Sequence, residues 1–122
     1  MAEQSHITDW AIGEDKTFAF TIYQKTAASV LTSTPQDITG WTLRWDMRRS
    51  DSEADPVVLS KVTPAQIVIN PGTGGTGYIV IEDIDTDLLS GRVYRHAMKR
   101  ADLGSETVLF FGNALLAKRA TR

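Results

Sequence analysis

Apolar and polar residues alternate along most of this chain, which is the spacing that sends successive side chains of a β-strand to opposite faces of a sheet. Residues 41–49 show the pattern most clearly, because the odd positions through Met47 are apolar and the even ones are polar. Apolar repeats at the helical spacing of three or four residues are scarce. The chain is therefore predicted to fold almost wholly as strands.

Turn-forming residues divide this pattern into short segments. A first short strand is predicted to end at residues 10–12. The other predicted strands span residues 18–23, 41–49, 57–62, 67–69, 78–81, 92–100 and 106–117. Residues 26–39 are rich in Thr and Ser and contain Pro35, so they are predicted to form a long connection or a weak edge strand. Residues 83–90 leave room for one helical turn before Gly91.

Many short strands without crossover helices predict an all-β fold, an immunoglobulin-like antiparallel β-sandwich of about seven or eight strands with at most one short helical turn. The segment Asp-Leu-Leu-Ser-Gly-Arg-Val-Tyr at 87–94 agrees with this fold. In such sandwiches a Tyr near the start of the penultimate strand bonds back to the preceding loop, and Tyr94 has that position. An ordinary core Tyr is the alternative interpretation.

The length of 122 residues fits a single domain, 1–122, with a short polar N-terminal arm of about residues 1–8. One hydrophobic core is expected. The residues predicted to form it lie on the apolar sides of alternating strands: Phe18, Phe20, Trp41, Trp45, Tyr94 and Met98.

The composition excludes several classes of protein. Hydrophobic residues make up 42% and charged residues 23%, as in globular domains, and the absence of cysteine excludes disulfides and thiolate zinc sites. Thirteen Lys and Arg against 15 Asp and Glu give a net charge of −2, which argues against a nucleic-acid partner. The N-terminus, Met1 to Asp9, is polar and lacks the apolar h-region of a signal peptide, and no run approaches the ~18 apolar residues that span a bilayer. Neither a signal peptide nor membrane insertion is therefore expected.

Two motifs suggest ligand sites but lack the context these need. Glycines in the segment 72–77 spell G-x-G-x-x-G, yet a strand rather than a helix follows, so a hairpin turn is expected in place of a nucleotide site. The acidic segment 82–87 opens like a calcium loop but has no Gly at the sixth position and Tyr94 at the twelfth. A looser oxygen-ligand site and a set of solvated carboxylates both stay open.

Catalytic and sugar-binding residues are also hard to find. His6 and His96 lie on different predicted strands without thiol partners, so structural roles are expected, and neither a metal site nor a cofactor site is predicted. Exposed tryptophans stack on sugars in some β-sandwiches, but Trp10, Trp41 and Trp45 fall on predicted core faces. The protein is therefore predicted not to be an enzyme, and a carbohydrate-binding module is a further alternative.

A basic stripe is the first candidate interaction surface. If the strand 41–49 pairs with the strand 92–100, four cations share one outer face: Arg44, Arg48, Arg95 and Lys99. Such a stripe would dock an acidic partner surface, and a solvated face relieved by Asp46 is the alternative.

The last predicted strand is apolar on both faces, which implies a second interface. Leu109 and Phe111 are its expected anchors, with the N-terminal arm ordering only against a neighbouring subunit. A bulge at Gly112 is the alternative, since it would turn Val108, Phe110 and Leu115 all inward.

The chain resembles small immunoglobulin-like virion proteins of tailed phages and prophages, and broadly the N-terminal domain of baseplate upper proteins. The resemblance rests on Gly-Glu-Asp-Lys-Thr-Phe at 13–18, Asp-Ile-Thr-Gly-Trp-Thr-Leu at 37–43, Asp85-Thr86 with Gly91 and Tyr94, Arg-Ala-Asp-Leu-Gly-Ser-Glu-Thr-Val-Leu at 100–109, and Phe111-Gly112.

This resemblance implies a non-enzymatic structural component of the virion, made in the host bacterial cytoplasm, without catalytic residues or cofactors. It would be an adaptor or accessory protein of the tail, baseplate or neck that joins larger virion parts. Its partners would be other phage virion proteins, and it would form a homo-oligomer or symmetric array in the particle. A capsid decoration protein is the alternative.

Overall fold

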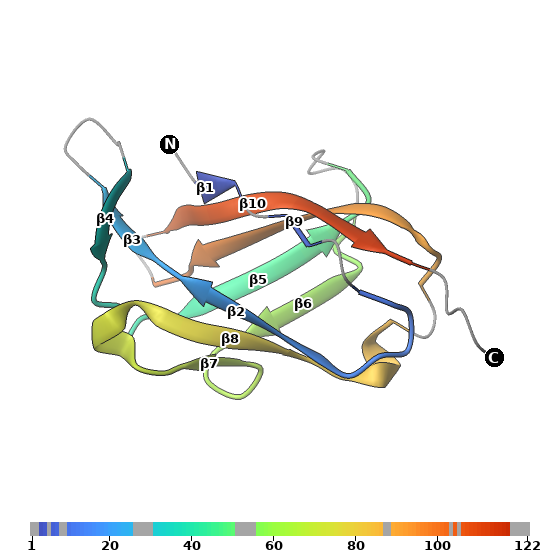
Figure 1. The fold of residues 1–122 in the computed structure, drawn as a ribbon, viewed down its shortest axis with the longest axis horizontal. Coiled ribbons are helices and arrows are strands. Elements are labelled where there is room, and N and C mark those ends of the chain that lie inside the picture. The colour runs from blue at the N-terminus through green and yellow to red at the C-terminus, as the bar shows by residue number, and fades with distance from the viewer. Residues whose placement is uncertain are drawn as a thin grey trace.

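The computed structural model describes residues 3–4, 6–7, 10–25, 31–50, 56–86, 89–102, 104 and 106–117 (Figure 1). The elements of these residues are β1 (Glu3–Gln4), β2 (Lys16–Thr21), β3 (Tyr23–Lys25), β4 (Leu31–Pro35), β5 (Leu43–Arg48), β6 (Leu59–Val62), β7 (Ile67–Ile69), β8 (Thr76–Ile81), β9 (Arg92–Arg100) and β10 (Thr107–Leu116), with two 3₁₀ turns, η1 (Gly72–Gly74) and η2 (Asp83–Asp85). None of the helical turns in this part of the chain is long and apolar enough to cross a membrane.

Two sheets pack as the layers of a sandwich, as Figure 1 shows. One has the order β1-β10-β9-β5-β6, and the other has the order β2-β8-β7. Lettered from β2 as strand B to β10 as strand G, with β6 as C′, these sheets are GFCC′ and BED, which is the immunoglobulin arrangement. The predicted all-β sandwich is confirmed.

Three details differ from the prediction. Of the two alternatives for residues 26–39, the described part agrees with the weak strand: β4 pairs with β3 in a separate two-stranded sheet, which the prediction did not include, and residues 26–30 lie outside the described part. The described residues form two helical turns rather than at most one, because η1 forms in the glycine-rich segment as well. The strand predicted at 57–62 begins only at Leu59.

The N-terminal segment contacts its own chain. β1 pairs in parallel with β10, and bridges join Ile7 to Ala114 and Ala11 to Ala117. The expectation that this arm orders only against a neighbouring subunit is therefore wrong, because the edge of β10 supplies the main-chain partners it needs.

The core lies between the two sheets. Trp45, Tyr94 and Met98 are almost fully buried and Phe20 is buried, whereas Phe18 and Trp41 are partly buried against the core. Trp41 precedes β5, whose first residue, Leu43, is fully buried. The guanidinium of Arg100 covers the Trp41 ring at 4.0 Å from its centroid. Trp41 therefore packs at the margin of the core.

The link from η2 to β9 has the predicted tyrosine corner. The Tyr94 hydroxyl donates a hydrogen bond to the Ser90 carbonyl at 2.8 Å, four residues upstream. Its ring is 1% exposed, so the same side chain both fills the core and holds the preceding loop.

A bulge in β10 changes which of its residues face the core. The register passes from Val108 opposite Lys99 to Phe110 opposite Met98, which leaves Leu109 as the extra residue. Leu109 and Phe110 are both buried as a result, whereas Val108 and Leu115 are exposed. The bulge thus lies three residues before the predicted Gly112, and it does not turn Val108 or Leu115 inward.

Candidate binding surfaces

The predicted basic stripe exists as a shared face. β5 and β9 pair antiparallel, with Arg44 opposite Lys99 and Arg48 opposite Arg95. Directly opposite residues of an antiparallel pair lie on the same side of the sheet. Because Trp45 and Met98 point into the core between them, the four cations lie on the outer face of the five-stranded sheet.

Polar contacts order this face. Asp46 is only 4% exposed and accepts hydrogen bonds from Arg44 Nε at 2.9 Å and from Ser60 Oγ at 2.8 Å. Arg95 Nη1 donates to Asn113 Oδ1 on β10. Asp46 therefore offsets one cation of the stripe, and within the described residues no ion pair joins Arg48 or Lys99 to a carboxylate.

Apolar side chains continue the same face toward one end. Val93 and Leu115 stand directly opposite one another on β9 and β10 and are 47% and 42% exposed. Phe111 is half-buried, with the Arg95 guanidinium 5.8 Å from its ring centroid. Of the two interface anchors expected from the sequence, Phe111 lies on the outer face. The prediction for Leu109 is wrong, because the bulge turns its side chain into the core.

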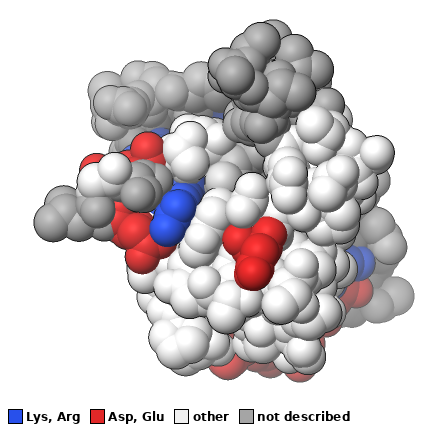
Figure 2. Space-filling view, turned by 90° about the vertical axis from the view of Figure 1, so that its left-hand side faces the viewer, with Lys and Arg blue, Asp and Glu red and all other residues white. Residues whose placement is uncertain are grey.

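The outer face of the three-stranded sheet has a different chemistry. The register of β2 and β8 places Thr17 opposite Val80, Ala19 opposite Tyr78 and Thr21 opposite Thr76. None of these residues carries a charge. Figure 2 shows the end of the molecule with the β3–β4 hairpin, where one group of acidic side chains lies near the middle of a largely uncharged surface and basic and acidic side chains adjoin at the left.

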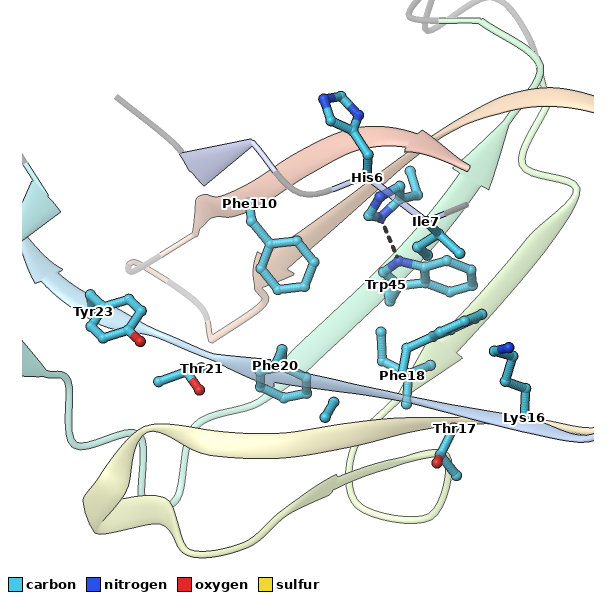
Figure 3. Close-up of a pocket in the computed structure, with 13 residues that line it drawn as sticks. His6, Ile7, Lys16, Thr17, Phe18, Phe20, Thr21, Tyr23, Trp45 and Phe110 are labelled. Atoms are coloured by element: carbon cyan, nitrogen blue, oxygen red, sulfur yellow. Dashed lines mark hydrogen bonds between the residues drawn. The ribbon is translucent and has the colours of Figure 1, made fainter. Parts of the chain in front are cut away.

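A cleft of about 560 Å³ lies between β2 and the N-terminal segment (Figure 3). Its aromatic lining comes from both sheets: Phe18 and Phe20 of β2, Trp45 of β5 and Phe110 of β10. His6 and Ile7 form part of the opposite wall, where His6 Nδ1 accepts a hydrogen bond from the Asn113 amide at 3.0 Å. The sequence does not predict this cleft, because no local pattern indicates which sheet edges stay apart.

A buried polar pair forms part of the lining of the cleft. Trp45 Nε1 donates to His96 Nδ1 at 3.0 Å, and both residues are nearly fully buried. Since the indole is only a donor, Nδ1 of His96 acts as the acceptor and the ring proton sits on Nε2. This is the structural role expected for His96.

The tryptophans do not form a sugar-binding platform. Trp10 is 2% exposed and packs edge-on against Phe18, with ring centroids 5.1 Å apart. Trp45 is fully buried, and Arg100 covers the ring of Trp41. The prediction that Trp10 and Trp45 pack in the core is confirmed.

The acidic segment and the glycine-rich segment have structural roles. Asp85 pairs with Lys61 at 2.6 Å, and Lys61 is only 4% exposed, so this ion pair ties η2 to the edge strand β6. Gly75 has a φ of +70°, and a Cβ there would lie 2.6 Å from the Ile22 carbonyl, so the segment is a tight turn as expected. Among the described residues no group of three or more potential metal ligands is brought together, and Asp87 lies outside them.

The turn between β9 and β10 is held by a carboxylate. Asp102 accepts hydrogen bonds from Arg100 Nε at 2.8 Å and from the Thr42 amide at 3.0 Å. The bond from Arg100, followed by that from Thr42, lowers the pKa of the Asp102 carboxyl below its usual value.

A scan against protein-family models finds no match for the chain, and a search of curated proteins finds no match either. The likeness to phage virion proteins therefore stays a hypothesis based on the sequence. The described residues form a β-sandwich with two unlike outer faces and a cleft between its layers.

Proposed function

We propose that the protein is a non-enzymatic structural component of a tailed-phage virion, an adaptor or accessory protein of the tail, baseplate or neck. The observation that carries the proposal is the contrast between the two outer faces of one thin sandwich. One face is basic and partly apolar, and the other is uncharged. Two unlike faces suit a small domain that joins two different neighbours, and the sequence resemblance supports placing those neighbours in a virion.

The basic face is the surface we assign to an acidic partner. Its cations are aligned across β5 and β9, and two of them are held before any partner arrives: Arg44 by Asp46 on the same strand and Arg95 by Asn113 on β10. Ordered charges accelerate association with a complementary surface and set its orientation, and salt weakens them. The exposed pair of Val93 and Leu115 adds apolar area beside the charges.

The test reverses two charges on β9, Arg95→Glu with Lys99→Glu. The new carboxylates face Arg48 and Arg44 across the strand pair, so opposite charges meet and the sheet is retained. Reversing Arg44 instead would leave the buried Asp46 without its cation. We expect the double variant to fold normally and to co-sediment with assembled particles about tenfold less than the wild-type protein, a loss of roughly 1.4 kcal/mol.

The matched control adds two carboxylates at exposed turn positions outside both faces, Ala65→Glu with Ile84→Glu. This variant should be incorporated like the wild-type protein. Normal incorporation of the β9 variant would remove the basic face from the proposal. Electron microscopy of particles carrying the labelled protein locates it, and label over the capsid shell in place of the tail, baseplate or neck would favour a decoration protein.

A further inference from the structure

The strand β2 has one unpaired edge. It is the outermost strand of the order β2-β8-β7, and within the described residues no strand pairs with its other side. A strand edge of this kind presents main-chain donors and acceptors to any chain that lies alongside it.

The hydrogen-bond pattern shows which residues of β2 present those groups. The Ile22 amide donates to the Gly75 carbonyl at 2.8 Å. The main-chain N–H and C=O groups of Ile22, and of alternate residues before it in β2, therefore point toward β8. The Val80 amide donates to the Gln66 carbonyl at 2.9 Å, so the main-chain groups of Val80 point toward β7 and not toward β2. This agrees with the alternation of main-chain directions along β8. The main-chain groups of three β2 residues therefore point away from the sheet: Thr17, Ala19 and Thr21.

The cleft runs along this open edge. Phe18 and Phe20 of β2 reach into it from one wall, and Trp45 and Phe110 belong to the opposite sheet (Figure 3). Ile7 on the far wall is held to β10 by bonds between the Ile7 amide and the Asn113 carbonyl at 2.9 Å and between the Leu115 amide and the Ile7 carbonyl at 2.8 Å. The N-terminal segment is thus committed to β10 and leaves the edge of β2 open.

The charge of the lining favours an acidic group. Lys16 is the only Lys or Arg among the described residues that line the cleft, and none of them is Asp or Glu. Its ion pair with Glu14 is 3.7 Å long and the Glu14 side chain is 46% exposed, so this pair is weak. A carboxylate entering at this end of β2 complements Lys16.

We propose that β2 and the adjoining cleft receive an extended strand of a partner protein. The strand pairs with the outward main-chain groups of Thr17, Ala19 and Thr21 and places alternate apolar side chains in the cleft and an acidic side chain beside Lys16. A cleft of this volume also suits small ligands, but only a polypeptide satisfies a row of main-chain groups. The inference depends only on β2 and the cleft, and it holds whether or not the protein is a virion component.

The experiment screens the full-length protein against immobilised octapeptides in which apolar and polar residues alternate, with one Glu at either end. Scrambled versions with contiguous apolar residues are the controls. The best binder is then synthesised with N-methyl groups at alternate amides. Methylation of one set removes the donors that face β2, so we expect it to weaken binding at least about tenfold, whereas the other set retains binding.

A variant of the protein provides an independent measurement. Ala19→Pro removes a donor that points outward, and an edge strand tolerates proline at such a position. We expect a folded protein with peptide binding weakened about tenfold, and Ala19→Ser as a control with binding retained. Three results would overturn the proposal: scrambled peptides bind equally well, both N-methylated sets behave alike, or the wild-type protein forms a dimer that Ala19→Pro dissociates, which would make a second copy the occupant.

Discussion

The two sheets cover one core but meet their surroundings in different ways. The five-stranded sheet has an ordered basic outer face, and β1 pairs with β10 at one of its edges. The three-stranded sheet has an uncharged outer face and ends at β2, whose second side pairs with no other described strand. Charged side chains on an outer face keep that face in contact with water. An open edge next to an apolar cleft instead presents main-chain groups and apolar surface to another chain. The difference suggests that each sheet contacts a partner by its own means, one through side chains and one through the main chain.

The largest expected effect concerns the core that both sheets share. The comparison of the two sheets assumes that they differ only at their solvent-exposed faces and edges. Trp45 is fully buried between them and bonds to His96. Trp45→Ala should lower the free energy of unfolding by about 3–5 kcal/mol. Urea denaturation followed by far-UV and near-UV circular dichroism should show one coincident transition for both sheets. Trp41→Ala, at the margin of the core, is the control with a smaller loss, and an unchanged midpoint for Trp45→Ala would contradict the assigned facing.

The bulge in β10 separates the inside of the five-stranded sheet from its outside. Leu109→Ala removes a side chain that is 8% exposed and should cost about 2–3 kcal/mol of unfolding free energy. The same change at Leu115, which is 42% exposed, should stay within about 0.5 kcal/mol. Chemical denaturation of both variants measures the difference. A strand without the bulge would give Leu109 and Leu115 similar, small effects.

The tyrosine corner tests the connection that leads from the three-stranded sheet to the five-stranded one. Tyr94→Phe keeps the buried ring and removes the hydroxyl bond to Ser90, so it should cost about 1 kcal/mol of unfolding free energy. Tyr78→Phe is the matched control on the uncharged outer face and should change the stability by less than about 0.5 kcal/mol. Equal effects of the two substitutions, measured by thermal melting, would show that the corner bond adds nothing.

The smallest effect concerns the turn that joins β9 to β10. The pKa of Asp102 is lowered in the folded protein from an ordinary value of 3.8, so its contribution to stability is present above about pH 4 and is lost as the pH falls through the lowered pKa. Asp102→Asn should therefore be slightly less stable than the wild-type protein at about pH 6, and the difference should disappear as the pH falls below the lowered pKa of Asp102. Melting temperatures across this range measure it, and a constant difference would exclude a contribution from the ionised carboxylate.

Much of the fold follows from local pattern. The alternation in residues 41–49 predicts β5 and its buried face, and the segment before Tyr94 predicts the corner bond. The four cations of the basic face also follow, because a strand period of two and one correct pairing place them together. The bulge at Leu109 does not follow, since Val108, Leu109 and Phe110 are all apolar and any of them suits the core.

The sequence alone determined that this chain is an all-β sandwich with a buried tryptophan core and a basic stripe. These features follow from the order of neighbouring side chains, which alternate between the two faces of each strand. Only the tertiary structure decided which edges are covered. The N-terminal segment can pair with one sheet edge, and its parallel pairing with β10 leaves β2 open beside the cleft. Which edge the N-terminal segment pairs with depends on main-chain hydrogen bonds between residues about a hundred positions apart in the chain. The local order of side chains does not predict such bonds, because every strand edge offers the same main-chain groups.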